Sequence, residues 1–536
     1  MSKGSRKRLT LGLVLGVGAL GVALGWPIPD SERWEFGPDP KLAAGKTSYL
    51  SALAAETFDK RPNVLLIVTD DLGRYDLSAY GHTAAHTPNI DALARDGVQF
   101  LSAFATAAIC APSRAALLTG RYQNRFGFES QPMQRYVRNL GEYLGFRYLI
   151  DTDEMQPFLL DTYPNAEQRL RQGLPASEIS LGDALDAAGY ATGIFGKWHL
   201  GYGPENHPQA FGFEQQYGFT EAFSLYANEG APGIVEHRHE LFWEEHIWNM
   251  GREGPSAITR NGEPIAEARY LTDAIVEETK RFVSDARAEE RPFFAYVPFS
   301  APHTPFQARS EDFLAVRGAA DHNERVYLAM IQRLDWAVGE LVRYLESQGM
   351  LDDTLIVFTS DNGGAAYTGA TDNGPLRGGK FTHFDGGLAV PLILAQRDVL
   401  APRSVRRPVI LTDLFATILR HCGLELPSDR TYDSVDLLTE PDSDTERSLF
   451  WRSEFNRTVR RGSWKLVQNR RDGQLQLFNL ADDPGEQHDL AEDQPAVVAE
   501  LVTDLDAWEQ EMAPALWPRV MNYHYEDAIG SYWFAI

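Results

Sequence analysis

The sequence predicts an α/β fold: a large, mixed but mostly parallel central sheet flanked by helices, with a smaller α+β subdomain at the C-terminus. Apolar runs of strand length at residues 63–69 (NVLLIVT) and 354–360 (TLIVFTS) lack polar alternation, which is typical of strands buried on both faces of a parallel sheet. Apolar residues recur every three or four positions from Tyr327 to Leu345 and indicate one face of a helix, which Gly349 ends. Strand patterns that alternate with helical ones are the signature of βα units.

The N-terminal segment, residues 1–25, is predicted to be a signal peptide or an uncleaved signal anchor. Four basic residues at positions 3–8 precede an apolar run over 9–25, whose 17 residues are at the lower limit for crossing a bilayer. Small residues just before Trp26 favour cleavage at that point. We therefore expect an exported protein, periplasmic or extracellular, that contacts a membrane only through this segment if it stays uncleaved.

The rest of the chain divides by composition and pattern. Residues 26–60 hold four prolines and no clear period, so we interpret them as a linker. Residues 61–425 form the main domain; its probable strands also include 190–195 and 292–299. A stretch without βα rhythm at 133–172 is interpreted as an insertion. Short strands at 464–467 and 475–480 indicate an antiparallel subdomain over 426–510, followed by a C-terminal tail at 511–536.

Composition excludes several classes of function. The 536 residues are 43% hydrophobic and 23% charged, enough for a packed core and incompatible with disorder of the whole chain. A formal net charge of −25 argues against a nucleic-acid-binding protein, which needs a basic face. The two cysteines, Cys110 and Cys422, are too few for a disulfide scaffold or a cysteine-based zinc site.

Polar side chains follow each predicted strand of the main domain. Asp70 and Asp71 end the first, residues 196–199 (GKWH) the second, His303 comes after the third, and residues 361–364 (DNGG) follow the fourth. Because ligands bind outside the carboxyl ends of parallel strands, these groups are expected at one edge of the sheet.

Carboxylates gathered at one edge repel each other unless a cation neutralises them. Three aspartates and the amide oxygen of Asn362 form an all-oxygen set that suits Ca²⁺ or Mg²⁺ rather than zinc. The alternative is that these are solvated carboxylates in ordinary turns.

The densest motif is residues 110–120 (CAPSRAALLTG), where 113–118 indicate the start of a helix and place Cys110 near its N-terminus. A lone cysteine is usually a small buried apolar residue, and a plain thiol nucleophile is a further alternative.

These motifs resemble those of the type I, formylglycine-dependent sulfatase family of the alkaline phosphatase superfamily. The segment 110–120 matches the first family signature, and 189–201 (GYATGIFGKWHLG) matches the second. Further matches follow in the usual order, and the resemblance spans about residues 61–495: Asp70-Asp71, 301–305 (APHTP), 360–363 (SDNG), 376–380 (LRGGK), 461–466 (RGSWKL) and 477–486 (LFNLADDPGE). Asp385 stands where the family more often has glutamate, and the 133–172 stretch exceeds the usual spacing.

The resemblance implies an alkaline phosphatase-like fold and a catalytic cysteine that a separate formylglycine-generating or sulfatase-maturating enzyme oxidises. The aldehyde formed from Cys110 would hydrate; one hydroxyl would attack sulfur, and the other would then release sulfate by elimination. Such a reaction needs its barrier lowered by on the order of 20 kcal/mol. One Ca²⁺, with Mg²⁺ as the alternative, would be held by Asp70, Asp71, the modified Cys110, Asp361 and Asn362.

The same resemblance implies roles for the remaining polar residues. Arg114 and Lys197 would orient the diol, and Lys380 would bind the sulfate. His303 would protonate the leaving oxygen, and His199 would take the diol proton.

Three functions are therefore weighed. The first is a sulfuric ester hydrolase acting on a sulfated carbohydrate; the aromatic residues Trp198, Trp243 and Trp248 are candidates for stacking on sugars, although aromatic residues are more often core. The second is a phosphonate monoester or phosphodiester hydrolase of the same superfamily. The third is a non-catalytic glycan-binding protein in which Cys110 stays a thiol. The sugar, the position of its sulfate, exo or endo action, and the oligomeric state have no signature in the sequence.

Overall fold

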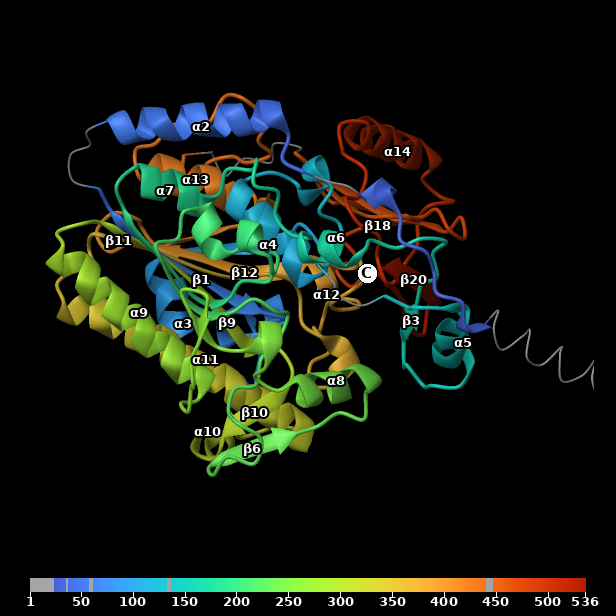
Figure 1. Ribbon diagram of the computed structural model, residues 1–536, viewed down its shortest axis with the longest axis horizontal. Helices are drawn as coiled ribbons and strands as arrows, with labels where there is room; N and C mark the ends of the chain where they lie inside the picture. The colour runs from blue at the N-terminus through green and yellow to red at the C-terminus, as the bar shows by residue number, and fades with distance from the viewer. Residues whose placement is uncertain (1–23, 35–36, 57–60, 133–135, 440–446) are drawn as a thin grey trace, which may run out of the picture.

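The computed structural model describes residues 24–34, 37–56, 61–132, 136–439 and 447–536, drawn as a ribbon in Figure 1. The predicted export segment, 1–25, lies almost wholly outside these ranges. Within them, no helix combines the length and apolar character required to cross a membrane.

An eleven-stranded mixed sheet forms the centre of the described chain, as the sequence predicted. Five neighbouring strands, in the order β11-β1-β9-β4-β5, are all parallel, and antiparallel partners flank them on both sides. The strands of this sheet are β1 (Asn63–Asp70), β2 (Val98–Phe104), β4 (Ala191–Lys197), β5 (Gln215–Phe219), β7 (Thr259–Arg260), β8 (Glu263–Pro264), β9 (Phe293–Pro302), β11 (Thr354–Ser360), β12 (Ala389–Ala395), β13 (Arg403–Val405) and β14 (Val409–Ile410).

Helices cover both faces of this sheet, which is why β1 is apolar without interruption over residues 64–68. Leu65 and Ile67 pack on the face covered by α3, α9 and α11, whereas Val64 and Leu66 pack on the face covered by α4, α7 and α13 (Figure 1). Each of these fully buried aliphatic side chains contributes roughly 1.5–3 kcal/mol of transfer free energy. The helices are α3 (Pro88–Asp96), α4 (Cys110–Thr119), α7 (Leu181–Ala187), α9 (Leu271–Ala288), α11 (His322–Ser347) and α13 (Asp413–His421).

Helix α11 confirms the helix predicted from apolar spacing. The Asp321 side chain caps its first turn by accepting a hydrogen bond of 2.9 Å from the backbone N–H of Glu324. Gly349 lies just beyond its end with φ +67°, a conformation that glycine adopts without strain.

The linker predicted over 26–60 was wrong for its second half, because residues 40–55 form helix α2 (Pro40–Ala55). Pro40 lies in the first turn, where the missing N–H of proline costs nothing, and Asp39 accepts hydrogen bonds from the next backbone N–H groups. Leu53 joins the core, and the Lys46 ammonium lies 2.8 Å from the carboxylate of Asp183. Pro40 therefore marks the start of a helix rather than a flexible connection.

The expected insertion and the expected tail form one small sheet, which corrects the prediction of a C-terminal tail. The insertion contributes β3 (Met155–Pro157), and the C-terminus contributes the hairpin β19 (Met521–Glu526) and β20 (Ser531–Ala535). Asn522 of β19 pairs with Gln156 of β3. The insertion also contains the helices α5 (Leu140–Tyr148) and α6 (Ala166–Leu170).

The antiparallel C-terminal subdomain is confirmed. Its four-stranded sheet and one helix are β15 (Ser448–Ser453), β16 (Asn456–Arg461), β17 (Trp464–Asn469), β18 (Leu475–Asn479) and α14 (Pro495–Glu509). The remaining described elements are β6 (Ile234–His237), β10 (Phe306–Arg309), α8 (Phe242–Met250), α10 (Ser310–Ala315) and α12 (Asp385–Leu388), besides short 3₁₀ turns.

His383 joins the two domains. Its ring nitrogens lie 3.0 Å from the Thr458 hydroxyl and 3.0 Å from the Ser453 hydroxyl, so two strands of the C-terminal sheet hold a loop of the main domain. Burial, with a smaller effect from the charge of Lys465, lowers the pKa of His383 to about 3, and the ring is neutral in the folded protein.

This neutral histidine makes the fold sensitive to acid. The pKa of His383 is lower in the folded chain than the unfolded value near 6.5, so its contribution is complete above about pH 6.5 and is lost as pH falls toward 3. When the pH is lowered from 7.5 to 5, the unfolding free energy of wild type should fall by about 2 kcal/mol more than that of His383→Gln. Denaturant midpoints at the two pH values measure this. The matched control is His86→Gln, at an exposed histidine, and an equal loss in wild type and His383→Gln would contradict the assignment.

Candidate functional site

Register between β1 and β11 brings four predicted residues together. Thr69 pairs with Ser360, so the next residues of both strands emerge side by side at the carboxyl edge of the sheet. The backbone N–H of Asp71 donates a hydrogen bond of 3.2 Å to Asp361, and the Asn362 amide donates one of 2.8 Å to Asp71. These side chains are buried, which rules out the alternative of solvated turn carboxylates.

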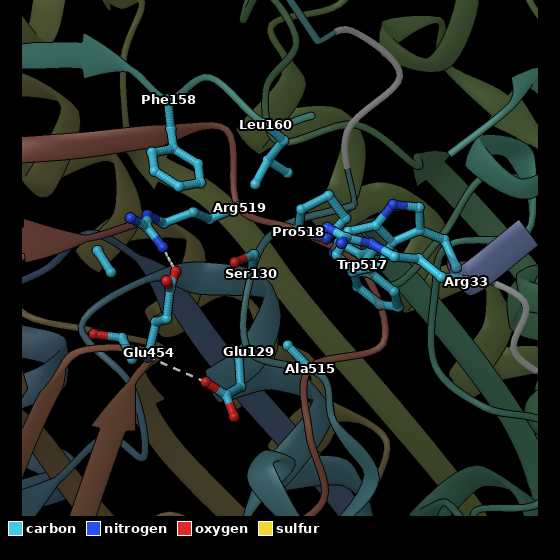
Figure 2. A pocket seen from close by; sticks show the side chains of 13 residues that line it. Arg33, Glu129, Ser130, Phe158, Leu160, Glu454, Ala515, Trp517, Pro518 and Arg519 are labelled. Atoms are coloured by element: carbon cyan, nitrogen blue, oxygen red, sulfur yellow. Dashed lines mark hydrogen bonds and ion pairs between the residues drawn. The ribbon is translucent and has the colours of Figure 1, made fainter. Parts of the chain in front are cut away.

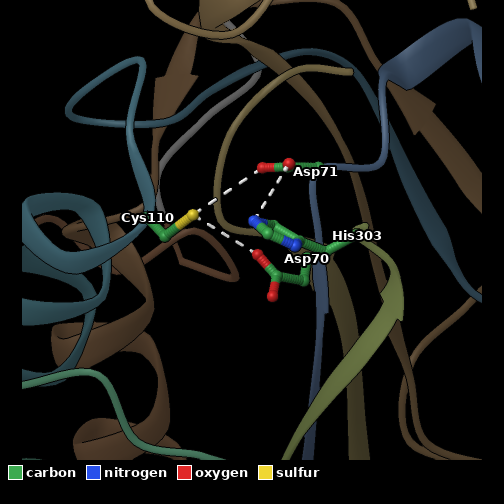
Figure 3. Close-up of side chains that lie close together, drawn as sticks. All are labelled: Asp70, Asp71, Cys110 and His303. Carbon is green, nitrogen blue, oxygen red and sulfur yellow. Dashed lines mark hydrogen bonds and ion pairs between the residues drawn. The ribbon is translucent and has the colours of Figure 1, made fainter. Parts of the chain in front are cut away.

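Cys110 begins helix α4 and points its thiol into this group. Its Sγ lies 3.3 Å from the Asp70 carboxylate and 3.7 Å from that of Asp71, as Figure 3 shows. Burial, and then the negative charge of Asp361, raises the pKa of the Cys110 thiol well above its ordinary value. The unmodified thiol is therefore protonated at neutral pH and is a poor nucleophile.

Three buried cations each pair with one of the three aspartates. The Lys197 ammonium is 2.7 Å from Asp70, and the Lys380 ammonium is 2.7 Å from Asp71. Arg114, one turn after Cys110 on α4, donates to Asp361 at 2.8 Å. Six buried charges seldom stabilise a fold better than apolar residues of the same size, so this cluster indicates chemistry rather than a structural role.

Pairing also shifts the ionisation of the cluster. Burial acts to raise the pKa of Asp71, but the charge of Lys380 outweighs it and holds this pKa well below its usual range. Burial acts to lower the pKa of Lys380, and the charge of Asp71 overcomes it, so the net pKa is well above its ordinary value. Both groups are charged at neutral pH.

The two predicted histidines lie at this cluster in neutral form. His303 follows β9; its Nδ1 is 2.6 Å from the Thr304 carbonyl oxygen, which fixes the proton on Nδ1 and leaves Nε2 facing Asp71 at 3.6 Å (Figure 3). Burial and then the charge of Lys380 lower the pKa of His303 to about 3.

His199 lies on the turn after β4 with φ +58°. Burial and then Lys197 lower its pKa well below the ordinary value. Both of its ring nitrogens are buried without a hydrogen-bond partner among the described residues. A buried polar ring without partners is costly and is typical of a group that meets a ligand.

The residues at this edge fit a divalent cation. Ligand atoms of Asp70, Asp71, Cys110 and His303 lie within 4.8 Å of one another. Asn362 adds a buried amide oxygen that has no hydrogen-bond partner in the described chain. Oxygen donors on several rigid strand ends are the ligand type that hard cations prefer.

Comparison with known proteins decides the family. The family model described as Sulfatase matches residues 62–424. The chain belongs to the sulfatase family.

Similar proteins act on sulfate esters. N-acetylgalactosamine-6-sulfatase of Rattus norvegicus is 34% identical over 398 residues, which cover 73% of this chain and 67% of the relative. N-acetylgalactosamine-6-O-sulfatase of Bacteroides thetaiotaomicron is 29% identical over 511 residues, covering 82% and 92%. The crystal structure of Ps i-CgsB in complex with k-i-k-neocarrahexaose matches with a TM-score of 0.70 at 28% identity, covering 85% of this chain and 95% of that one. This sulfatase is thus a sulfuric ester hydrolase with the alkaline phosphatase-like fold, and the non-catalytic alternative is set aside.

Two tyrosines near the cluster had no signal in the sequence. The Tyr226 hydroxyl lies 2.6 Å from the carbonyl oxygen of Ser300 and 2.8 Å from that of His303, and its one proton, shared between them, holds the turn that carries His303. The Tyr367 ring stacks on Phe381, the residue after Lys380, with ring centroids 5.4 Å apart. Both roles depend on contacts between distant segments, which no local pattern reveals.

The three tryptophans considered for sugar stacking differ in exposure. Trp198 is 1% exposed; its indole N–H donates to the Asn206 carbonyl oxygen at 2.7 Å, so it is core. Trp248 is 8% exposed, whereas Trp243 lines a hollow beside Thr304 and Tyr367.

None of the predicted site residues lines a second hollow, whose lining is drawn in Figure 2. Two of its charged groups, Arg519 and Glu454, pair with each other, and Glu129 pairs with Arg452, which lies outside the lining. The Arg519 guanidinium also lies 3.9 Å from the Phe158 ring centroid. This hollow offers no free convergent set of catalytic groups comparable with the aspartate cluster.

Divalent cation binding will stabilise this sulfatase. At 100 times the dissociation constant the gain is about 2.7 kcal/mol, which appears as a higher thermal midpoint on adding Ca²⁺ to chelator-treated protein. Asp361→Asn removes one ligand charge, and we expect it to lose most of this gain. Asp352→Asn, at a carboxylate 64% exposed, is the control. A gain that survives in Asp361→Asn would remove Asp361 from the ligand set.

Proposed function

We propose that this sulfatase releases inorganic sulfate from a sulfated carbohydrate, using a formylglycine made from Cys110 and one Ca²⁺ held by Asp70, Asp71, Asp361 and Asn362. The observation that carries this proposal is the position of Cys110 at the first residue of α4, its Sγ within 3.7 Å of two buried carboxylates. A modified side chain there would face the cation directly. Mg²⁺ is the alternative ion.

Oxidation of Cys110 would have to precede folding. Cys110, Pro112 and Arg114, the residues of the expected maturation motif, are all fully buried in α4. A separate formylglycine-generating or sulfatase-maturating enzyme would therefore act on the unfolded chain, which agrees with a protein that is exported through its 1–25 segment.

The hydrated aldehyde and the cation would supply complementary chemistry. When present, the hydrated aldehyde supplies a hydroxyl nucleophile and a route for sulfate release, and the cation offsets negative charge on sulfate oxygens. Lys380 and Lys197 would exchange their present aspartate partners for sulfate and diol oxygens. Arg114 remains a fixed cation: burial lowers its pKa, Asp361 raises it, and the net value lies above the ordinary one.

Two neutral histidines are suited to proton transfer. His303 presents Nε2 to the cluster because Nδ1 donates to the Thr304 carbonyl oxygen. We assign it to the leaving oxygen, since it lies beside Lys380, the proposed sulfate ligand. His199, beside Lys197 in the chain, would accept the diol proton. Anionic ester bound between them would raise the pKa of both rings, so that His303 would take up a proton on Nε2 and could donate it to the leaving oxygen near neutral pH.

The proposed carbohydrate substrate rests on the relatives. Two of them are named for N-acetylgalactosamine sulfate, and one solved relative holds a carrahexaose. The phosphonate monoester alternative has no residue in the cluster that favours it over the sulfate ester.

Protein co-expressed with a maturation enzyme should show conversion of Cys110 and release free sulfate. The peptide that contains residue 110 should lose about 18 Da, the difference between CH₂SH and CHO. Cys110→Ala should fold normally by circular dichroism and release no sulfate. Full activity of protein with an unmodified thiol would disprove the mechanism, and faster cleavage of an aryl phosphonate than of sulfate esters would favour the alternative.

The effect of replacing His303 on the rate of sulfate release should depend on the leaving group. We expect His303→Ala to slow sulfate release from sugar sulfates by about 10²–10⁴-fold, because an alkoxide needs protonation as it leaves. Release from 4-nitrophenyl sulfate, whose leaving phenolate is stable, should fall far less. His199→Ala should slow both substrates alike. Equal losses for both substrates in His303→Ala would remove it from the leaving-oxygen role.

A further inference from the structure

A hollow adjoins the end of the cluster where the ester sulfate is proposed to bind. Thr304 and Tyr367 form its inner wall: Thr304 follows His303, and Tyr367 stacks on the neighbour of Lys380. The insertion and helix α8 form its outer wall. Its lining consists of Asp153, Glu154, Met155, Leu241, Trp243, Glu244, Ile247, Thr304 and Tyr367.

One aromatic residue in this lining has a polar atom without a partner in the described chain. The indole Nε1 of Trp243 is buried and has no hydrogen-bond acceptor among the described residues. Tyr367 lines the same hollow, and its ring stacks on Phe381. Aromatic side chains that combine an apolar face with a free donor match a sugar ring, which has a C–H face and hydroxyl acceptors.

The acidic and basic side chains that line the hollow are all of one sign. Asp153, Glu154 and Glu244 are its only ionisable acidic or basic residues, and all three are carboxylates. Glu244 is buried and fixed, since His239 Nδ1 lies 2.5 Å away and the Trp248 indole donates to it at 3.1 Å. Asp153 and Glu154 are exposed on the turn before β3.

The cluster and the hollow therefore differ in charge. In the cluster, Lys197, Lys380 and Arg114 each pair with an aspartate, whereas the described wall of the hollow has carboxylates and no lysine or arginine. Like charges brought within several ångströms of each other in a partly dehydrated site repel strongly. A second anionic group on the same sugar would face this wall.

We propose that this hollow binds the sugar ring of the leaving alcohol and selects units on which the sulfate to be removed is the only anionic group. This rests on the proposed function and names its substrate class: neutral hexoses or N-acetylated hexosamines carrying a single sulfate. Units with a second sulfate or a carboxylate are disfavoured by Asp153, Glu154 and Glu244.

The test compares matched sugars in the matured enzyme. Free sulfate is measured from galactose, glucose and their N-acetylhexosamines, each with one sulfate at a defined position or with a second sulfate added. We expect kcat/KM to be at least about tenfold higher for the monosulfated member of each cleaved pair. This preference should shrink as ionic strength rises, because salt screens the repulsion.

Substitutions locate the preference in the hollow. The double variant Asp153→Asn, Glu154→Gln should reduce the monosulfate preference by about fivefold or more by raising kcat/KM for the disulfated sugars. Glu245→Gln removes a charge from the same helix outside the hollow and should change the preference much less. Trp243→Phe keeps the ring but removes the N–H, and should raise KM for the monosulfated sugar without changing the preference.

The outcomes separate the two proposals. Sulfate release with equal kcat/KM for both members of each pair, or a preference unchanged in the double variant, would overturn the charge selection and leave the proposed function intact. No sulfate release from any sugar by enzyme that contains formylglycine would overturn the carbohydrate substrate itself, and the selection with it.

Discussion

The site depends on one constraint, the parallel pairing of β1 with β11. Because Thr69 lies opposite Ser360, the residues that follow are forced together, and Asp70, Asp71 and Asp361 meet in a buried place. Three carboxylates there would repel each other, and three cations from other elements offset them. Burial makes this arrangement costly in free energy, but it also strengthens the electric field of the charged groups. A reaction that moves negative charge requires such a field.

The two parts of the proposed substrate site are built by different parts of the chain. The cation cluster comes from strand ends and from the start of α4, all anchored in a core with helices on both faces. The hollow beside it comes from the insertion, α8 and the turn that carries Tyr367. The C-terminal hairpin supports this wall, since Tyr523 packs on Phe381 and β19 pairs with β3. Changes in these outer segments can alter specificity while the cluster stays the same.

The spacing of apolar residues in the sequence predicted those strands and helices whose formation depends on local burial. Continuous apolar runs revealed β1 and β11, and three–four spacing revealed α11, because burial on both faces or one face dictates those periods. Strand ends predicted the meeting of Asp70, Asp71 and Asp361, and the motif around Cys110 predicted the helix start. The prolines that begin α2 were misinterpreted as a linker, since capping and packing decide their effect. The pairing of β3 with β19 and the roles of Tyr226 and Tyr367 arise from contacts between segments remote in sequence, which no window of residues contains.

The most direct test is a crystal structure of the matured enzyme, with anomalous scattering used to identify the ion. The account predicts density for a hydrated aldehyde at residue 110 and one Ca²⁺ contacting oxygens of Asp70, Asp71, Asp361 and Asn362, with Lys197 and Lys380 turned from the aspartates toward sulfate. An active enzyme that carries an unmodified thiol at residue 110, or a cation bound away from these four residues, would contradict it.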